Sequence, residues 1–199
     1  MRAKHEAPES ETEVSLPPFP DLPCELAESV PERRIITLVS GLPRSGTSLM
    51  MQMLAAAGMP IFTDDERTAD ESNPKGYFEH HRVASLPRER DLAWLLEARG
   101  KALKVVAPLL PFLPAQVAGE PLYYRLIFMD RPMPEIIGSQ AAMLARLGRD
   151  KAGADVARAY RQQIPAAQAW MKQLTANGQL VGMAIDYRAL VAEPADHAK

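Results

Sequence analysis

The residues from Gly41 to Ser48 have the types and the spacing of a loop that binds a phosphate or a related anion. Gly41 and Gly46 are separated by four residues, and Thr47 and Ser48 supply hydroxyl groups directly afterwards. In such a loop the glycines allow backbone N–H groups to converge on an anion at the start of a helix. The alternative is an ordinary turn in which Ser45 or Thr47 only caps the helix.

The cation of this loop is not where nucleotide-hydrolysing enzymes have it. Those enzymes place a lysine directly after the second glycine, where this chain has Thr47. Arg44 is the only cationic residue inside the loop. A loop that keeps the glycines and moves the cation favours an anionic group other than the β- and γ-phosphates of a magnesium nucleotide.

Two segments must position the loop, a strand before it and a helix after it. Residues 35–39 form a short apolar run with β-branched side chains, which is typical of a strand buried in a parallel sheet. From Thr47 onward apolar residues recur at helical spacing until Gly58 and Pro60 end the pattern. The order strand, loop, helix is the context that a phosphate-binding loop requires.

The rest of the chain alternates predicted strands and helical segments. The further strands are expected at residues 101–107, 123–129 and 180–185. The helical segments are expected at residues 78–99 with a break at Pro87, 109–113, 133–147, 151–176 with an interruption near Pro165, and 187–192. This alternation predicts an α/β fold, a P-loop-type parallel sheet flanked by helices on both faces. Ligands bind such sheets beyond the carboxyl ends of the strands.

The sequence PRSGTSLM, at residues 43–50, resembles the 5′-phosphosulfate-binding loop of sulfotransferases that use 3′-phosphoadenosine 5′-phosphosulfate (PAPS). In that family a lysine or arginine precedes Ser-Gly-Thr-Ser/Thr. The resemblance implies a sulfotransferase-like fold and transfer of a sulfuryl group from PAPS to a hydroxyl or amine of a small-molecule or peptide acceptor. It assigns cofactor binding to the following residues: Arg44, Ser45, Gly46, Thr47 and Ser48. Arg44 would also assist catalysis.

A second match follows the predicted strand at 123–129. Arg131 leaves the strand end and Ser139 comes eight residues later, about two helical turns on, so both could reach one phosphate. In sulfotransferases an arginine and a serine at this spacing bind the 3′-phosphate of the cofactor. The alternative is a surface arginine and an unrelated helical serine.

Residues 103–111 resemble the Lys-Thr-His-Leu-Pro segment of the cytosolic small-molecule sulfotransferases. Lys104 falls on the lysine, so the resemblance implies that it contacts the sulfuryl group during catalysis. Val106 falls where that subgroup has its catalytic histidine. Another group must therefore take the proton of the acceptor.

The protein-tyrosine sulfotransferases, whose Pro-Arg-Ser-Gly-Thr-Thr-Leu-Met loop is similar to this one, suggest that group. Aligned without gaps, their Glu-Glu-Thr-Arg segment falls on residues 64–67, so Asp65 corresponds to the catalytic carboxylate and Arg67 to a basic site residue. Asp65 is one methylene shorter than the glutamate, and a solvated acidic loop is the alternative. The competing bases are Glu79, His80 and His81. Two adjacent histidines on a helix are expected to point in different directions.

The segment 186–194 resembles the Tyr-Glu-Asp-Leu…Pro segment that ends a sulfotransferase core strand. Tyr187 matches its tyrosine, which contacts the cofactor in some members; structural packing is the alternative. Family members continue with a helix and often a Gly-rich, basic segment over the 3′-phosphate. Because this chain stops at Lys199, that closing element is expected to be missing.

Composition limits the class of protein. The 199 residues, 47% of them hydrophobic, suit one α/β domain at 32–199, after a Glu- and Pro-rich arm at 1–31 that is expected to be extended or disordered. The net charge of −2 indicates no nucleic-acid partner, and no run approaches the roughly 20 apolar residues of a membrane span. The single Cys24 and the four histidines indicate no disulfide and no metal site, which favours the cytoplasm.

Two other functions are open at this level. A P-loop kinase is the rival enzyme, because residues 126–130 form an apolar strand that ends in an aspartate, Asp130, able to hold a metal. Against a kinase, Thr47 replaces the loop lysine, and Arg131 and Ser139 would have no assigned role. The third possibility is a protein that binds a nucleotide without turnover, which the missing histidine and the short C-terminus favour.

Overall fold

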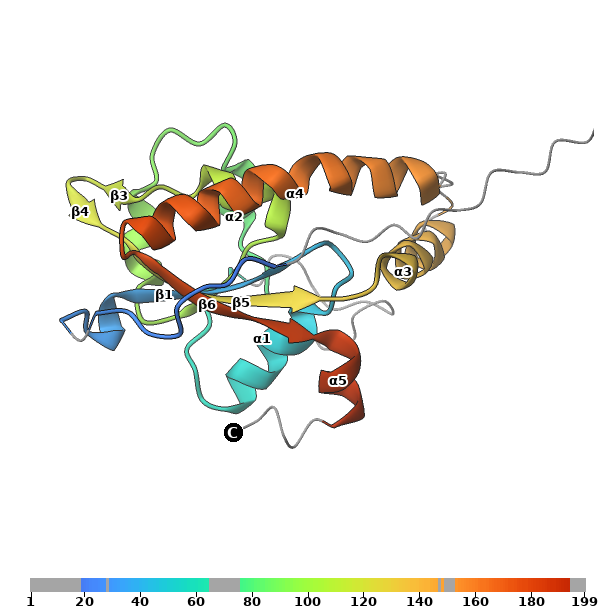
Figure 1. Ribbon diagram of the computed structural model, residues 1–199, viewed down its shortest axis with the longest axis horizontal. Helices are drawn as coiled ribbons and strands as arrows, with labels where there is room; N and C mark the ends of the chain where they lie inside the picture. The colour runs from blue at the N-terminus through green and yellow to red at the C-terminus, as the bar shows by residue number, and fades with distance from the viewer. Residues whose placement is uncertain (1–18, 28, 65–75, 147, 149–152, 194–199) are drawn as a thin grey trace, which may run out of the picture.

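The computed structural model describes residues 19–27, 29–64, 76–146, 148 and 153–193. Its centre is a four-stranded parallel sheet with the strand order β2-β1-β5-β6 (Figure 1). The strands are β1 (Ile35–Gly41), β2 (Ala102–Lys104), β5 (Tyr123–Asp130) and β6 (Leu180–Asp186). The predicted α/β class with a parallel sheet flanked by helices is confirmed.

Helices cover both faces of this sheet. The helices α1 (Thr47–Ala56) and α5 (Tyr187–Ala192) lie on one face, whereas α4 (Gly153–Ala176) and the 3-10 helix η3 (Ala107–Phe112) lie on the other (Figure 1). The helix α3 (Met133–Arg146) packs against α4 beyond the carboxyl end of β5.

Successive side chains of a strand point to opposite faces of the sheet, so β1 contributes to the hydrophobic core on both faces. Leu38 is fully buried in the core that includes Trp170 of α4, and the next residue, Val39, is fully buried in the core with Met51 of α1. All seven residues of β1 are buried. The loop that follows β1 therefore leaves a strand that is held on both sides.

The segment at 78–99 is not the broken helix that the sequence predicts. It holds only the short helix α2 (His81–Ser85) and the 3-10 helix η2 (Ala93–Ala98), with turns between them. The Arg82 guanidinium bonds to the Glu89 carboxylate at 3.3 Å and to the Asp91 carbonyl at 2.9 Å, which stabilises those turns. The predicted strand at 101–107 is also shorter: β2 ends at Lys104, and η3 begins at Ala107 with Pro108 in its first turn.

Helix α4 runs through Pro165 without the predicted interruption. Pro165 faces solvent, where water can satisfy the carbonyl that the missing N–H leaves unpaired. Ile164 and Trp170, which lie on either side along the helix, are buried in the core and stabilise the helical path. A small antiparallel pair, β3 (Gln116–Val117) and β4 (Glu120–Pro121), was not predicted.

Part of the predicted N-terminal arm packs on the sheet. Residues 19–27 form no helix or strand, but Leu22 is only 8% exposed and the ring of Phe19 lies 5.0 Å from that of Phe128. The Gly182 N–H of the edge strand β6 donates to the Pro23 carbonyl at 3.0 Å. Residues 1–18 lie outside the described part of the chain.

None of the helices within the described ranges combines the length and apolar character needed to cross a bilayer. The predicted cytoplasmic location stays a prediction.

Replacing Leu22 by Ala should lower the free energy of unfolding by about 2–3 kcal/mol, because it removes a buried side chain from the main core. Urea denaturation followed by circular dichroism measures this. Val191→Ala is the control: Val191 is 53% exposed on α5, and its truncation should change stability by less than about 0.5 kcal/mol. Equal effects of the two substitutions would contradict the packing of residues 19–27.

Candidate functional site

The loop between β1 and α1 has the backbone conformation that converging N–H groups need. Gly41, Arg44 and Gly46 have φ angles of 142°, 73° and 104°. The Ser45 N–H donates to the Leu42 carbonyl at 3.0 Å and closes the turn. Gly46 is the N-cap of α1, and no side chain caps this helix end. The first N–H groups of α1 are thus available to an anion.

Both glycines of the loop are required by close contacts. A Cβ atom at Gly41 would lie 2.6 Å from the Met129 carbonyl oxygen of β5. A Cβ atom at Gly46 would lie 2.5 Å from the ring of Tyr187, the first residue of α5. Tyr187 therefore packs directly against the glycine at the mouth of the loop.

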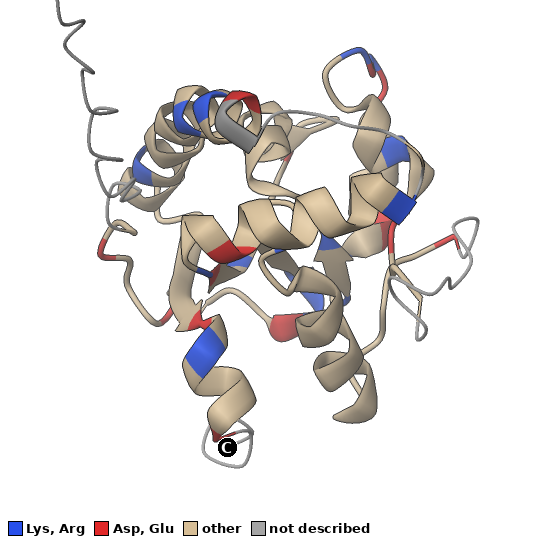
Figure 2. Ribbon diagram, turned by 90° about the vertical axis from the view of Figure 1, so that its right-hand side faces the viewer, with Lys and Arg blue, Asp and Glu red and all other residues tan. Residues whose placement is uncertain are grey.

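Most of the predicted site residues line one cavity of about 540 Å³ at the carboxyl edge of the sheet. They are Arg44, Gly46, Thr47, Ser48, Lys104, Arg131, Ser139 and Tyr187. Figure 2 views the molecule from this side, with Lys and Arg in blue and Asp and Glu in red. The structure thus brings together four parts of the chain that are far apart in sequence.

Arg44 joins the loop to α3. Its Nε donates to the Ser139 hydroxyl at 3.0 Å, and its Nη1 lies 3.9 Å from the Met143 sulfur. Arg131 approaches from the end of β5 and donates from Nη1 to the Arg44 carbonyl at 3.0 Å. Two guanidinium groups and a hydroxyl consequently meet at one end of the cavity, an arrangement suited to a phosphate group.

Arg131 is held on two further sides. Its Nε donates to the Glu135 carboxylate at 2.9 Å, and its guanidinium carbon lies 4.2 Å from the centroid of the Tyr187 ring. Hydrogen bonds from Arg131 and from Arg188 hold the pKa of Glu135 below its usual value. The Glu135 carboxylate therefore orients the Arg131 guanidinium. Glu135 follows Arg131 by four residues, a helical spacing whose role the sequence analysis missed.

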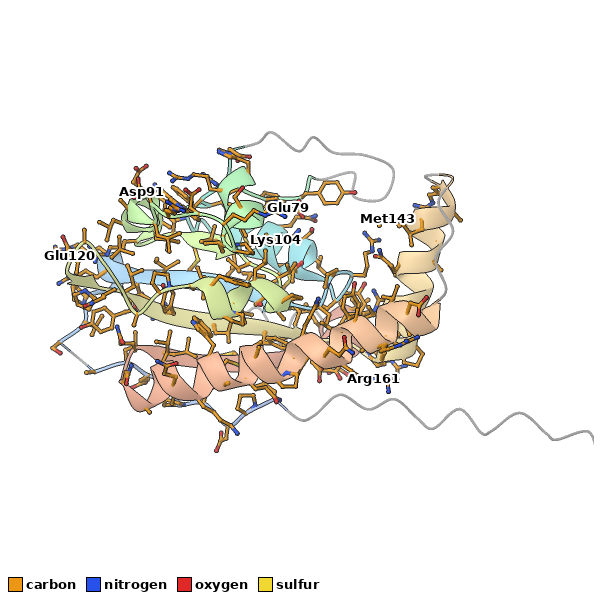
Figure 3. The ribbon with its side chains drawn as sticks, turned by 90° about the horizontal axis from the view of Figure 1, so that it is seen from above. Glu79, Asp91, Lys104, Glu120, Met143 and Arg161 are labelled. Atoms are coloured by element: carbon orange, nitrogen blue, oxygen red, sulfur yellow. The ribbon has the colours of Figure 1, made fainter. Side chains whose placement is uncertain are left out.

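Lys104 marks the other end of the cavity. Its Nζ donates to the Ser48 hydroxyl at 3.0 Å, the Tyr77 carbonyl at 2.9 Å and the Glu79 carboxylate at 3.0 Å. The Lys104 side chain is only 5% exposed. Figure 3 shows Lys104 and Glu79 next to each other, with Met143 on α3 across from them. A buried positive charge thus lies beside the first turn of α1.

A second, smaller cavity of about 230 Å³ adjoins the first. Glu79, Lys104 and Val106 line both cavities. The remaining lining residues of the smaller cavity are Asp64, His80, His81, Val83, Ala84 and Leu109. The Lys104–Glu79 ion pair therefore stands at the junction of the two cavities.

The two histidines do not point in different directions as expected. Their ring centroids are 5.0 Å apart, with 17° between the planes, because His80 has extended backbone as the N-cap of α2 while His81 begins the helix. His80 also stacks on Phe62 at 4.8 Å. The Asp64 carboxylate lies 2.6 Å from His81 Nδ1. The ligand atoms of these two histidines and Asp64 lie within 4.8 Å of one another, close enough to hold a metal ion.

Among the described residues predicted for the site, Ser45 does not line the larger cavity. Ser45 is fully buried under the loop, and its hydroxyl has no hydrogen-bond partner among the described residues. Asp65 lies outside the described residues, as does Arg67. Among the competing bases, Glu79 lines both cavities, whereas His80 and His81 line only the smaller one.

Several lining residues of the larger cavity were missed by the sequence analysis. They are Pro43, Leu49, Gln52, Tyr77, Gln140 and Met143. The signal for Gln52 was its position four residues after Ser48, which places both on the same side of α1. Tyr77 contributes through its carbonyl group, and no side-chain pattern marks such a role.

Asp130, the residue of the kinase alternative, lines neither cavity. It pairs in register with Asp186 at the ends of β5 and β6. Burial raises the pKa of Asp130, and the charge of Asp186 raises it further.

No family model, no curated protein and no solved structure matches this chain.

Gly46→Ala should lower the free energy of unfolding by about 1–3 kcal/mol more than Gly58→Ala, because only the first substitution forces a methyl group into a packed ring. Gly58 is the matched control: its φ of 86° imposes similar backbone strain, but nothing lies within 4 Å of an added Cβ. Urea denaturation of both variants measures the difference. In a Tyr187→Ala background the difference should disappear, and its persistence there would contradict the Gly46–Tyr187 contact.

Proposed function

We propose that this protein is a sulfotransferase that moves a sulfuryl group from PAPS to a hydroxyl or amine acceptor. The observation that carries the proposal is the convergence on one cavity of four matched segments, residues 43–50, 103–111, 131–139 and 186–194. The Arg44–Ser139 hydrogen bond joins residues 95 positions apart, and the Lys104–Ser48 bond joins residues 56 apart. Segments that match short motifs only by chance are not expected to lie next to one another in the folded chain.

The sulfotransferase-like P-loop fold is part of this proposal. The matched loop follows β1, an inner strand of a parallel sheet, and leads directly into α1. Lys104 ends β2 and Arg131 follows β5, the two strands that neighbour β1. The site therefore lies where ligands bind parallel sheets, beyond the carboxyl ends of the strands.

The residues present fit the cofactor. The uncapped N–H groups of α1, with Thr47 and Ser48, would hold the 5′-phosphosulfate. Arg131 and Ser139 would hold the 3′-phosphate at the opposite end of the cavity, as the resemblance implies.

PAPS, when bound, supplies the sulfuryl group: the acceptor oxygen or nitrogen forms a bond to sulfur, and the bond from sulfur to the 5′-phosphate oxygen breaks, releasing 3′,5′-adenosine bisphosphate. The chain provides the groups that face the developing negative charge. Loop N–H groups are fixed donors at this point, and the buried Lys104 adds a positive charge beside them; such preorganised groups stabilise charge that grows in the transition state. The Arg44 side chain, which the resemblance also assigns to catalysis, is bonded to Ser139 at the end proposed for the 3′-phosphate.

Glu79 is the general base that we favour among the described residues. It stands at the junction of both cavities, 3.0 Å from Lys104, and therefore reaches an acceptor placed next to the cofactor. Lys104 Nζ donates to this carboxylate and holds it at the junction. His81 is already bonded to Asp64 and lines only the smaller cavity. Asp65 stays the alternative that the resemblance implies.

The kinase alternative has less support from the site. Thr47 replaces the lysine, and Asp130 does not reach either cavity. A protein that only binds the nucleotide would use the same loop and cavity. It would differ from a sulfotransferase in showing no sulfuryl transfer.

Arg131→Ala should weaken binding of 3′,5′-adenosine bisphosphate by about 10- to 100-fold, the effect of removing a charge-assisted bond to a phosphate. Isothermal titration calorimetry without magnesium measures this. Arg125→Ala is the control, because Arg125 is also on β5 but pairs with Glu32 and does not line the cavity. If the protein binds magnesium-ATP but not 3′,5′-adenosine bisphosphate, the sulfotransferase proposal is wrong and the kinase alternative takes its place.

Glu79→Gln should lower sulfuryl transfer from radiolabelled PAPS to a panel of simple phenols, alcohols and amines by about 100-fold or more, the contribution of a positioned base. Affinity for 3′,5′-adenosine bisphosphate should stay the same. Glu89→Gln, which removes a carboxylate paired with Arg82 away from the cavities, is the control. Loss of transfer in Asp65→Asn, with Glu79→Gln unaffected, would move the role of base to Asp65.

A further inference from the structure

Three side chains of the types that bind metal ions meet on the wall of the smaller cavity. Asp64 comes from the segment that follows α1, and His80 and His81 stand at the start of α2. The Asp64 carboxylate lies 2.6 Å from His81 Nδ1 and 3.8 Å from His80 Nδ1. Imidazole nitrogens and carboxylate oxygens are the ligands that zinc and related divalent ions take in sites with three protein ligands.

The two ring nitrogens differ in what they present to Asp64. His81 Nδ1 is hydrogen-bonded to the carboxylate at 2.6 Å. His80 Nδ1 accepts a hydrogen bond from the Arg82 N–H at 3.3 Å, so this nitrogen carries a lone pair and no proton. A lone pair and a carboxylate oxygen therefore lie 3.8 Å apart, an arrangement that a cation stabilises. The proton on His81 bonds to the carboxylate alone, whereas a divalent ion in its place would bond to all three side chains.

Neighbouring residues hold these side chains together without a metal. The Thr63 hydroxyl donates to the Glu79 carbonyl at 2.8 Å, and these two residues directly precede Asp64 and His80. The Phe62 ring stacks on the His80 ring, with 4.8 Å between centroids and 7° between planes. The side chains of Asp64 and His80 are only 15% and 12% exposed. Ligands that are already ordered lose little conformational entropy when they bind a metal ion.

We infer that Asp64, His80 and His81 form a binding site for a divalent transition-metal ion of the zinc class. Their ligand atoms lie within 4.8 Å of one another, so modest side-chain rotations would bring all three to the roughly 2.0–2.2 Å that zinc requires. All three residues line the smaller cavity, so the fourth position of a tetrahedral ion faces that cavity and takes water.

The inference differs from the expectation that the sequence gives for metals. The spacing of the histidines along the chain indicates no metal site, because Asp64 is separated from His81 by 17 positions and only the fold brings them together. The site is also independent of the proposed function, since neither its ligands nor its test involves PAPS.

Zinc titration of the full chain, purified without a histidine tag and freed of metals by a chelator, tests the site. Isothermal titration calorimetry should show binding of a single Zn²⁺ ion. His81→Ala removes one ligand from an exposed position and should weaken binding by at least about 100-fold, the upper end of what loss of an outer-shell partner costs. His5→Ala removes a histidine from another part of the sequence and should leave binding unchanged. Equal affinities of wild type and His81→Ala would overturn the inference.

A second pair of variants tests the carboxylate ligand. Asp64→Asn removes its charge with little change of shape and should weaken Zn²⁺ binding by at least about tenfold. Asp21→Asn is the matched control, because Asp21 is exposed and does not line the cavity. If Asp64→Asn binds Zn²⁺ like wild type, the three-ligand site is wrong.

Co²⁺ gives a spectroscopic signature of the same site. Four-coordinate Co²⁺ absorbs visible light far more strongly than the six-coordinate aqueous ion. Co²⁺ added to wild type and to His5→Ala should produce this strong absorption, Zn²⁺ should abolish it, and His81→Ala should not show it. Weak absorption, the same in all three proteins, would show that only scattered surface groups bind the ion and that the inference is wrong.

Discussion

The buried ammonium group of Lys104 is the constraint on which the site depends. A lysine that is only 5% exposed is costly unless each of its donors is satisfied. Its three donors reach Ser48 on α1, the Tyr77 carbonyl and the Glu79 carboxylate. Satisfying one charge thus fixes the end of β2, the first turn of α1 and the segment before α2 relative to one another.

A second set of contacts fixes the opposite end of the cavity. The Tyr187 ring fills the space above Gly46 and also lies under the Arg131 guanidinium, 4.2 Å from its carbon. Arg131 in turn holds the carbonyl of Arg44, whose side chain reaches Ser139. Cations at both ends of the cavity are therefore held in place by packing and hydrogen bonds.

This arrangement lowers stability at the loop. Arg44 has a φ of 73°, a left-handed conformation that costs a non-glycine residue roughly 1–2 kcal/mol. The hydroxyls of Ser40 and Ser45 are buried without a hydrogen-bond partner among the described residues. Strain and unsatisfied groups of this kind persist where the surrounding structure holds them, here β1 with all seven residues buried. The rigid strand allows a strained, anion-ready loop to exist at its end.

The sequence by itself determined the parallel α/β class, because this depends on the alternation of strands and helices. Its short motifs and their resemblance to a known family pointed to the loop at 41–48 and to Lys104, Arg131 and Ser139, which stay predictions as site residues and line one cavity. It overestimated the helix at 78–99 and missed the packing of residues 19–27, since both follow from contacts with distant elements. Only the tertiary structure decided that Glu79 pairs with Lys104 and that two cavities meet there. Contacts of that kind join segments that pattern and propensity treat separately, and they form only when the strands are aligned in one sheet.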